Sequence, residues 1–488
     1  MPAAGHASSR LTRPHGGRPA PGDIRLSHVL GGLSAALDLA DGHLPGHAAR
    51  SALIGVRLGR IIGLTEAEQA ALLITILVKD LGASANAAQF VALFGADDHN
   101  VKAALRTVDW GRALEAVRFA AGQVSRGSAW PERGWRRLAA LTKGPAGVKD
   151  IARVRANHGA DLARDLSLTT DTVQAIRCLD EHWNGKGAPL GLSGHAIHPF
   201  ARIATLAQTM EVFWRAGGPR AALEVAALRR GQWFEPALVD ALVCLKSDEA
   251  FWAELAEPDI LTRALALEPG DRSSKVMPEG MDLIAEVFAR VIDAKSPWTL
   301  SHSAGVADLS VRMAVRLGMK ELPLADMRRA ALLHDLGKLG VSNLILDKPG
   351  PLAPTERLAI ERHPAATAAV LAATEGFSHL APVAAAHHER LDGRGYHQHL
   401  AAPGLSLPAR ILAVADIAEA LRSSRPYRPG LPPERLLAVI ARISGEAVDS
   451  ECGAALSDVL RDVPLPAATD APVVQVVPAL IEDYTQAA

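Results

Sequence analysis

Cysteine is scarce in this chain of 488 residues, and its three cysteines, Cys178, Cys244 and Cys452, lie far apart without a Cys-x-x-Cys pair. This spacing argues against a disulfide framework and against a zinc site built from thiolates. A chain without such a framework suits a reducing compartment, so we expect a cytoplasmic protein.

A strong charge of one sign and long apolar runs are also missing. The formal net charge is −1, which gives no electrostatic footprint for DNA, RNA or an acidic membrane surface. The longest apolar run, Ala70 to Val78, is too short to cross a bilayer and stops at Lys79 and Asp80. We therefore expect no nucleic-acid partner and no membrane insertion.

Residues 1–22 are rich in Pro, Gly, Arg and His but lack the apolar segment of a signal peptide, so we predict a flexible tail. No alternation of apolar and polar residues persists elsewhere, which predicts an all-α body. A chain of this length accommodates about two to four domains.

The chain repeats itself. In each copy a helix that begins with histidine is followed, 33 residues later, by an aspartate in Asp-Leu-Gly, from His47 to Asp80 and from His302 to Asp335. Further along, a spacing of 24 residues separates two more matched pairs, Asn184 to Gln208 and Asp392 to Asp416. Equal spacings in two blocks predict a tandem duplication.

The repeat divides the chain. We predict a tail at 1–22, a first copy at 23–242 with an insertion at about 83–145, a linker at 243–280, a second copy at 281–463 and a tail at 464–488. The last segment forms a docking strand or helix, or remains loose.

In the second copy, an apolar-periodic stretch predicts a helix that carries His334 and Asp335 in its last turn, with Gly337 as the stop signal. Thr299 is the predicted N-cap of an earlier helix that carries His302 in its first turn. A histidine interacting with the helix dipole beside a solvated aspartate explains the His334–Asp335 pair equally well.

Further histidines and aspartates favour a metal site over that simpler explanation. Asp416 lies in an apolar stretch without a polar face, where a buried acid must be paired or bind a metal. Any one of the histidines could be an ordinary core or surface residue. Together, seven residues at helix ends or in apolar helices form the candidate ligand set: His302, His334, Asp335, His363, His387, His388 and Asp416.

Four motifs then occur in a familiar order: His334-Asp335-Leu-Gly-Lys338, His363-Pro364, His387-His388-Glu-Arg-Leu-Asp-Gly-Arg-Gly395-Tyr396, and Arg425-Pro-Tyr-Arg428. Over about residues 281–460 the chain resembles the HD-GYP domain, a branch of the HD phosphohydrolase superfamily. The resemblance implies two tandem HD-type helical domains, of which the second binds two or three metal ions and hydrolyses a cyclic dinucleotide, typically cyclic di-GMP.

The resemblance assigns the seven residues above as metal ligands, with Asp335 as the bridging one. Members with three metals carry a Glu four residues before the first His, where this chain has Trp298, so we expect two ions. Imidazole and carboxylate ligands suit iron or manganese. Two ions about 3.5–4 Å apart would activate a water between them and offset phosphoryl charge, which makes Asp335 part of the catalytic group.

The implied substrate contacts are Lys338 at the scissile phosphate, Arg425 and Arg428 at the second phosphate, and Tyr396 at the nucleotide. A solvated lysine and ordinary turn residues are the simpler explanations. Two departures from the family bear on the substrate and leave the metal site intact. Gly305 stands where many members carry Arg, and His397 follows Gly395-Tyr396 where the family has Pro.

The first copy has lost most of the pattern. His47, Asp80 and His158 persist, whereas the other ligand positions carry Lys79, Leu179, Asp180 and Gln208. A lysine ammonium opposes a bound cation, so we expect no metal there and a regulatory or dimerisation role. A fragment from about residue 275 onward is accordingly expected to keep activity.

The pattern as a whole predicts a phosphodiesterase that uses two metal ions and converts a cyclic dinucleotide, most often cyclic di-GMP, to pGpG or GMP. An HD phosphohydrolase acting on another nucleotide, and a signalling adaptor that binds without turnover, remain alternatives. A homodimer or a signalling partner bound through the first copy is also expected.

Overall fold

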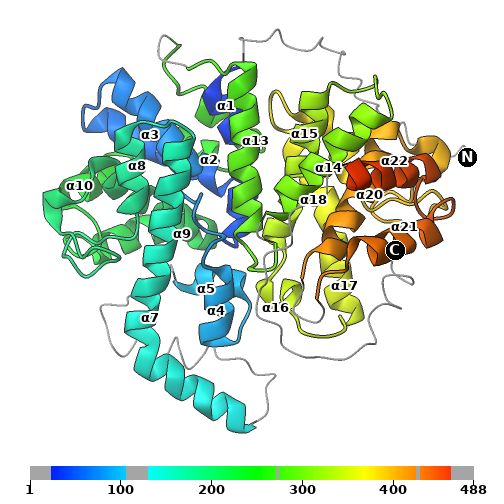
Figure 1. The fold of residues 1–488 in the computed structure, drawn as a ribbon. Helices are drawn as coiled ribbons and strands as arrows, with labels where there is room; N and C mark the ends of the chain where they lie inside the picture. The colour runs from blue at the N-terminus through cyan, green and yellow to red at the C-terminus, as the bar shows by residue number, and fades with distance from the viewer. Residues whose placement is uncertain (1–23, 106–129, 271–273, 300, 425–428, 463–488) are drawn as a thin grey trace, which may run out of the picture.

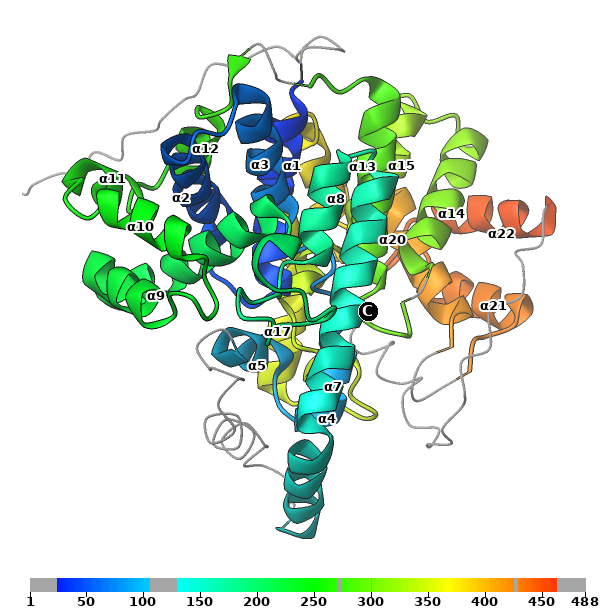
Figure 2. The ribbon, with the colours of Figure 1, turned by 90° about the vertical axis from the view of Figure 1, so that its left-hand side faces the viewer.

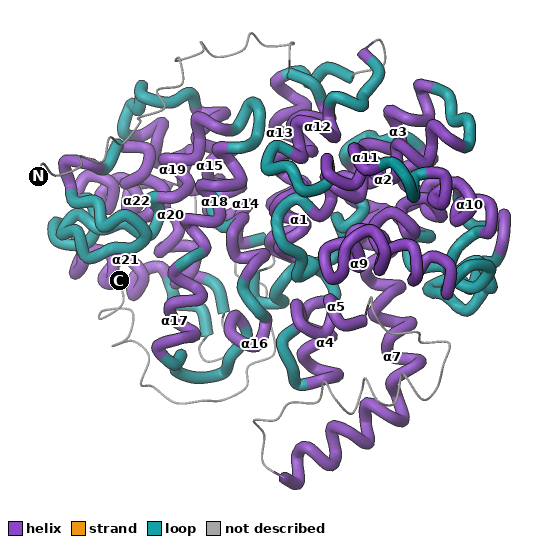
Figure 3. Tube along the Cα trace, turned by 180° about the vertical axis from the view of Figure 1, so that it is seen from behind, coloured by secondary structure: helices purple, strands orange, loops and turns teal. Residues whose placement is uncertain are grey.

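The computed structural model describes residues 24–105, 130–270, 274–299, 301–424 and 429–462. Over these residues the regular secondary structure is helical, and the only strand-like pairings are isolated bridges (Figure 3). The predicted all-α fold is therefore confirmed. The predicted tails, 1–22 and 464–488, lie outside the described residues.

The helices of the first copy occupy one side of the molecule and those of the second copy the other (Figure 1). The first copy contains α1 (Leu26–Ala40), α2 (His47–Ile61), α3 (Glu66–Val78), α4 (Ala87–Phe94), α5 (Asp98–Leu105), α7 (Trp130–Asp165), α8 (Thr170–Arg177), η1 (Gly194–Ala196), α9 (Pro199–Leu228) and α10 (Pro236–Cys244).

Two short helices, α11 (Glu249–Glu254) and α12 (Ile260–Leu265), lead to the second copy. It contains α13 (Pro278–Asp293), α14 (His302–Arg316), α15 (Leu324–Leu333), η3 (Leu336–Gly340), α16 (Asn343–Leu346), α17 (Pro354–Glu361), α18 (His363–Ala372), η4 (Ser378–Leu380), α19 (Ala381–Ala385), η5 (Ala402–Gly404), α20 (Leu407–Arg422), α21 (Pro433–Ile443) and α22 (Ser450–Asp462).

The two copies share their helix pairing. In the first, α2 packs on α3 and α9, and in the second α14 packs on α15 and α20. Helix α9 bends at Gly217 and Gly218, which leave helical geometry. In the second copy α20 ends at Arg422 and α21 begins at Pro433. The duplication read from residue spacing thus extends to how the helices pack.

The predicted insertion at about 83–145 covers α4, α5 and the start of α7. Figure 2 shows α7 projecting away from the body, with α4 and α5 beside its lower part. Buried Phe90 and Phe94 of α4, with Val101 of α5 and Ile151 of α7, form a small apolar cluster of their own. This cluster fixes α4 and α5 against α7.

One apolar core runs through both copies. Helix α1 packs on α3 of its own copy and also on η3 and α18 of the second copy. Gly32 of α1 lies so close to Thr374 that a Cβ there would meet its Cα at 2.6 Å. The division at 243–280 stays a prediction, and the core continues across it.

Candidate metal centre

Helix α15 ends at Leu333, slightly earlier than predicted, so His334 caps it and Asp335 begins the 3₁₀ turn η3. Gly337 is not the stop signal. It lies inside η3, and a Cβ there would overlap the carbonyl oxygen of His363. The glycine is needed because the start of α18 passes directly over η3. This close approach brings His363 to Asp335.

The N-terminus of α14 is held by Asp293, which the sequence analysis did not identify. Its carboxylate accepts a hydrogen bond from the hydroxyl of Ser303 at 2.7 Å, and its oxygens lie 3.3 Å from the Ser303 amide. The predicted cap, Thr299, instead donates to the carbonyls of Asp293 and Ser296. Asp293 therefore fixes the first turn of α14, where the buried His302 lies.

The carboxylate of Asp335 lies at the centre of the histidine cluster. Its Oδ2 is 3.4 Å from His334 Nε2 and 3.6 Å from His302 Nε2. Its Oδ1 is 3.3 Å from His363 Nε2 and 3.6 Å from His387 Nε2. Each oxygen thus faces a different pair of histidines, which is the arrangement that a carboxylate shared by two cations needs.

Asp416 of α20 lies against the same cluster. Its Oδ1 is 3.2 Å from His302 Nε2 and 3.6 Å from His334 Nε2, and its Oδ2 is 4.0 Å from His388 Nδ1. Within this cluster, ligand-type atoms close enough to share one ion form three groups: His302, His334 and Asp335; His334, His387 and Asp416; and His363, His387 and His388. The structure therefore brings together all seven predicted residues.

Three of the histidines are oriented in the same way. The Nδ1 atoms of His334, His363 and His387 lie 2.6–2.8 Å from the carbonyl oxygen three residues earlier. A carbonyl can only accept, so each Nδ1 carries the hydrogen and donates it. Each Nε2 then points into the cluster, as in histidines that bind metals.

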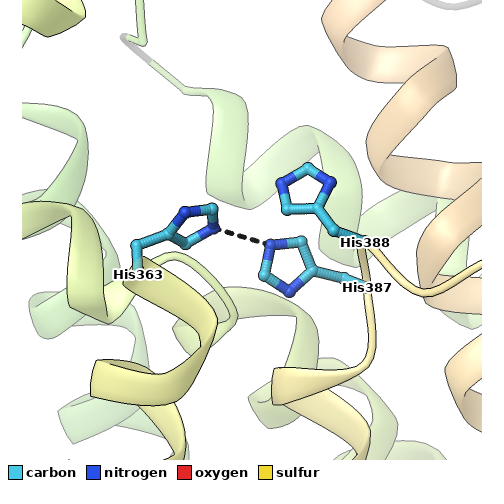
Figure 4. A group of neighbouring side chains, drawn as sticks. All are labelled: His363, His387 and His388. Carbon is cyan, nitrogen blue, oxygen red and sulfur yellow. Dashed lines mark hydrogen bonds between the residues drawn. The ribbon is translucent and has the colours of Figure 1, made fainter. Parts of the chain in front are cut away.

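Figure 4 shows His363 and His387 turned toward each other, with His388 beside them. The two Nε2 atoms are 2.9 Å apart. Because both Nδ1 atoms already carry hydrogen, a proton or a metal cation shared between the two Nε2 atoms makes that approach favourable. Burial lowers the pKa of His363 to about 4, which keeps its imidazole neutral.

Among the described residues, several buried polar atoms of the cluster have no partner of hydrogen-bonding geometry: both ring nitrogens of His302, His334 Nε2 and Asp335 Oδ1. Burial by itself lowers the pKa of His334, but Asp335 and Asp416 outweigh it and raise that pKa to about 10. A position between two buried carboxylates favours positive charge. The donors present thus fit divalent metal ions.

The predicted substrate contacts lie around this centre. Lys338 Nζ is 2.6 Å from Asp335 Oδ2, at the edge of the cluster. The Tyr396 ring stacks on His388 with ring centroids 4.7 Å apart and lies edge-on to His363. Arg425 and Arg428 lie outside the described residues, so their predicted role is unchanged by the structure.

Glu389 shapes the loop that carries Tyr396. Its buried carboxylate accepts hydrogen bonds from the amides of His397, Gln398 and Leu400 at 2.6–3.2 Å. A proline at position 397 could not donate such a bond. The bond from the His397 amide is therefore one that the family's proline could not make. Glu181 holds the matching loop of the first copy in the same way, so its retention in the repeat was a usable sequence signal.

Gly305 makes room for Glu419. A Cβ at position 305 would lie 2.5–2.8 Å from the Glu419 carboxylate. That buried carboxylate accepts two hydrogen bonds from the Arg422 guanidinium, at 2.6 and 2.9 Å. In the first copy the matching Glu211 instead accepts from Arg50, three residues after His47. The arginine missing from position 305 thus has a counterpart on α20.

In the first copy, the position that corresponds to the candidate metal centre holds a cluster of ion pairs. Lys79 is fully buried and pairs with Asp80. Arg155 donates to Asp80 Oδ1 at 2.5 Å and to both oxygens of Asp180 at 2.7–2.9 Å. Burial alone raises the pKa of Asp80, but Lys79 and Arg155 outweigh it and lower that pKa.

The prediction that His158 persists as a ligand-type residue in this cluster is wrong. A Cβ at Gly82 would overlap the carbonyl of Arg155, as one at Gly337 would overlap that of His363. Arg155 therefore occupies the third histidine position. His158 lies one helical turn further along α7, and its Nε2 has no hydrogen-bonding partner in the described part of the chain.

A helical pair that presents histidines and a shared aspartate defines the HD class of proteins. Residues 101–238 and 286–452 match the HD domain family, one segment in each copy. The chain belongs to the HD domain family, which confirms the resemblance to HD phosphohydrolases.

Two relatives and one solved structure show how much of the chain is similar to known proteins. The 3'3'-cGAMP-specific phosphodiesterase 3 of Vibrio cholerae is 38% identical over 440 residues, 90% of this chain and 95% of the relative. The cyclic di-GMP phosphodiesterase response regulator RpfG of Xanthomonas campestris is 34% identical over 171 residues, 35% of this chain and 45% of its own. The crystal structure of the V. cholerae cyclic GMP-AMP phosphodiesterase V-cGAP3 matches with a TM-score of 0.63 and 33% identity, over 90% of this chain and 99% of that one.

In the described part of the chain, none of the helices combines the length and apolar character that crossing a bilayer requires.

Proposed function

We propose that this chain is a metal-dependent phosphodiesterase that hydrolyses a cyclic dinucleotide. The observation that carries the proposal is the Asp335 carboxylate, whose two oxygens face two different histidine pairs at 3.3–3.6 Å. Two-ion centres of this kind suit phosphodiester hydrolysis.

We place 3'3'-cGAMP first among the substrates and cyclic di-GMP second. The relative that shares nearly the whole length of this chain is named for 3'3'-cGAMP, whereas RpfG, named for cyclic di-GMP, matches about a third of it. This order differs from the one that the motifs implied. Gly305 and His397 mark where the chain departs from the usual motif.

The seven residues of the cluster would hold two ions, with iron or manganese favoured by the imidazole and carboxylate donors. Such ions lower the pKa of a bound water and offset charge on the phosphoryl oxygens. Lys338 adds a positive charge beside Asp335 for the scissile phosphate. Tyr396 would contact a nucleotide, while Arg425 and Arg428 would bind the second phosphate.

Hydrolysis adds one water across one P–O ester bond. The phosphorus gains an OH group and the leaving sugar oxygen gains a proton, so the ring opens to a linear dinucleotide. A second water at the remaining diester gives two mononucleotides.

We also propose that the first copy is catalytically silent and serves regulation or dimerisation. Lys79 and Arg155 already supply positive charge to Asp80, so a metal cation there would meet two buried cations. Gln208 and Leu179, at two further ligand positions, offer no charged donor.

Incubation of manganese- or iron-loaded protein with 3'3'-cGAMP, cyclic di-GMP and their linear forms, followed by chromatography, tests the function. We expect ring opening of a cyclic dinucleotide that is absent in His334→Ala. Tight binding without any turnover in the loaded protein would identify an adaptor and contradict the proposal.

A further inference from the structure

Two residues of the first copy contact the backbone that follows the Asp335 motif of the second copy. The amide of Asn343 donates to Asp98 Oδ1 at 2.9 Å, and the Ser342 hydroxyl lies 3.2 Å from the same oxygen. Nε2 of His99 lies 3.1 Å from the carbonyl oxygen of Leu339. Both ends of segment 339–343 are therefore held from α5, and this segment begins directly after Lys338.

The contact is buried and charged. The Asp98 side chain is fully buried, 3.4 Å from Lys295 Nζ of the second copy and 3.7 Å from Lys102 Nζ of its own helix. Burial alone raises the pKa of Asp98, but the two lysines outweigh it and lower that pKa to about 2. The carboxylate is therefore ionised. Because it is buried, water cannot take the place of its protein partners.

Asp98 is fixed on its own side as well. Lys102 donates to the carbonyl oxygens of Ala40 at 2.9 Å and Ala83 at 2.7 Å. Ala40 is the last residue of α1. Ala83 lies shortly after Asp80, which belongs to the ion cluster. The position of Asp98 is thus set by the body of the first copy and not by a loose loop.

On the other side, the segment held by Asp98 backs the candidate metal centre. Lys338 and Asp335 line one hollow together with Lys295 and Ser296. The Asn343 side chain donates to the carbonyl of Lys295 at 2.6 Å. The backbone that follows Lys338 is therefore held from α5 at two places, by His99 at Leu339 and by Asp98 at Asn343.

We propose that Asp98 is a positioning residue for Lys338, so that the first copy sets where the Lys338 ammonium stands relative to Asp335. The inference rests on the proposed function, since it takes Lys338 as a phosphate contact. According to this inference, residues of the first copy help to set the geometry of the active site in the second copy.

Two substitutions separate the contributions of Asp98. Asp98→Ala removes the acceptor for the Asn343 amide, whereas Asp98→Asn keeps an oxygen there and loses only the charge. The matched control is His28→Ala, which breaks another contact between the copies, the 2.6 Å pair of His28 with Glu375, away from Lys338. We expect kcat/KM to fall about tenfold in Asp98→Ala, as for loss of a hydrogen bond to a charged group, and by less than about threefold in the other two variants. Metal content should be unchanged in all three.

A double-substitution cycle distinguishes positioning from general destabilisation. If Asp98 acts through Lys338, Asp98→Ala should change kcat/KM by less than about twofold in a Lys338→Ala background, because coupled residues are not additive. Equal fold-losses in both backgrounds, or loss of metal in Asp98→Ala, would overturn the inference.

Amide hydrogen exchange tests the same claim without any activity. Peptides covering residues 339–346 should exchange faster in Asp98→Ala than in the unsubstituted chain, and should not change in His28→Ala. Unaltered exchange in Asp98→Ala refutes the positioning role. Absence of turnover in the unsubstituted chain, with faster exchange in Asp98→Ala, would refute the proposed function and leave the contact itself established.

Discussion

Arg155 stands in the first copy where His363 stands in the second. Each passes its backbone carbonyl over a glycine, Gly82 or Gly337, and each directs its side chain at Oδ1 of the motif aspartate. The difference lies in the source of positive charge. The second copy surrounds its aspartate with imidazoles that can share an exchangeable cation, whereas the first copy provides a covalently attached guanidinium.

The first prediction concerns the metal centre. His334→Ala or Asp335→Ala should lower bound iron or manganese to below about a tenth of the unsubstituted level and abolish hydrolysis, since each removes a ligand with no substitute nearby. Metal analysis and circular dichroism measure loss of metal and retention of helix. His379→Ala, which alters a half-buried histidine paired with Asp326 at 3.1 Å, is the control. Full turnover in a variant that carries both substitutions, His334→Ala and Asp335→Ala, would contradict the metal-hydrolase assignment.

The second prediction concerns stoichiometry. Trp298 offers no ligand where members with three metals have Glu, so the protein should bind about two ions per chain. Inductively coupled plasma mass spectrometry on protein purified with manganese or iron measures the ratio. A third ion at full occupancy would show that another carboxylate has taken over the missing position.

A third prediction corrects the expectation that residues from about 275 onward suffice. Helix α1 covers η3 and α18, and removing it exposes the apolar core of the second copy. Burial is worth about 25 cal/mol per Å², so the fragment should be aggregated or strongly destabilised. Analytical ultracentrifugation and thermal denaturation of residues 275–488 test this. A monodisperse fragment with the full chain's kcat/KM would show that the copies are independent.

The ion cluster of the first copy supplies the fourth prediction. Lys79→Ala removes a fully buried cation that pairs with Asp80, and breaking a buried pair costs about 3–5 kcal/mol. The melting temperature should fall by several degrees while kcat at low temperature changes little. The control, Arg230→Ala, breaks an exposed pair with Asp240, which is worth about 0–1 kcal/mol. A melting temperature unchanged by Lys79→Ala would argue against a structural role.

The fifth prediction addresses the arginine on α20. Arg422→Ala leaves the buried Glu419 without its guanidinium, so activity should fall. Gly305→Arg in the same chain places an arginine three residues after His302, as Arg50 follows His47, and should recover at least part of kcat/KM. Steady-state kinetics on 3'3'-cGAMP and cyclic di-GMP measure the recovery. A double variant no better than Arg422→Ala would mean that the two arginines are not interchangeable.

The sequence predicted the all-α fold and the seven residues of the cluster because short motifs position them. His334 and Asp335 are adjacent, as are His387 and His388, and the apolar pattern places each pair at the end of a helix. No contact between distant residues had to be known. Because the motifs are short and local in the sequence, the duplication could also be recognised from the equal spacings between them.

What the sequence could not supply depends on contacts between segments far apart. Arg155 was missed in favour of His158 because the insertion removes the spacing that sets the register of α7. Asp293 was missed because it caps a helix that begins nine residues later, across a turn. Asp98 carries no motif, and its partner Asn343 lies 245 residues away.

Glu181 and Glu389 each anchor a loop through three backbone amides rather than through the side chains of that loop. Amides are present whatever residue is encoded, except proline. The tip of the loop can therefore accumulate substitutions over evolution while its path stays the same. Side chains around the candidate metal centre can in this way change one residue at a time while the residues of that centre stay in place.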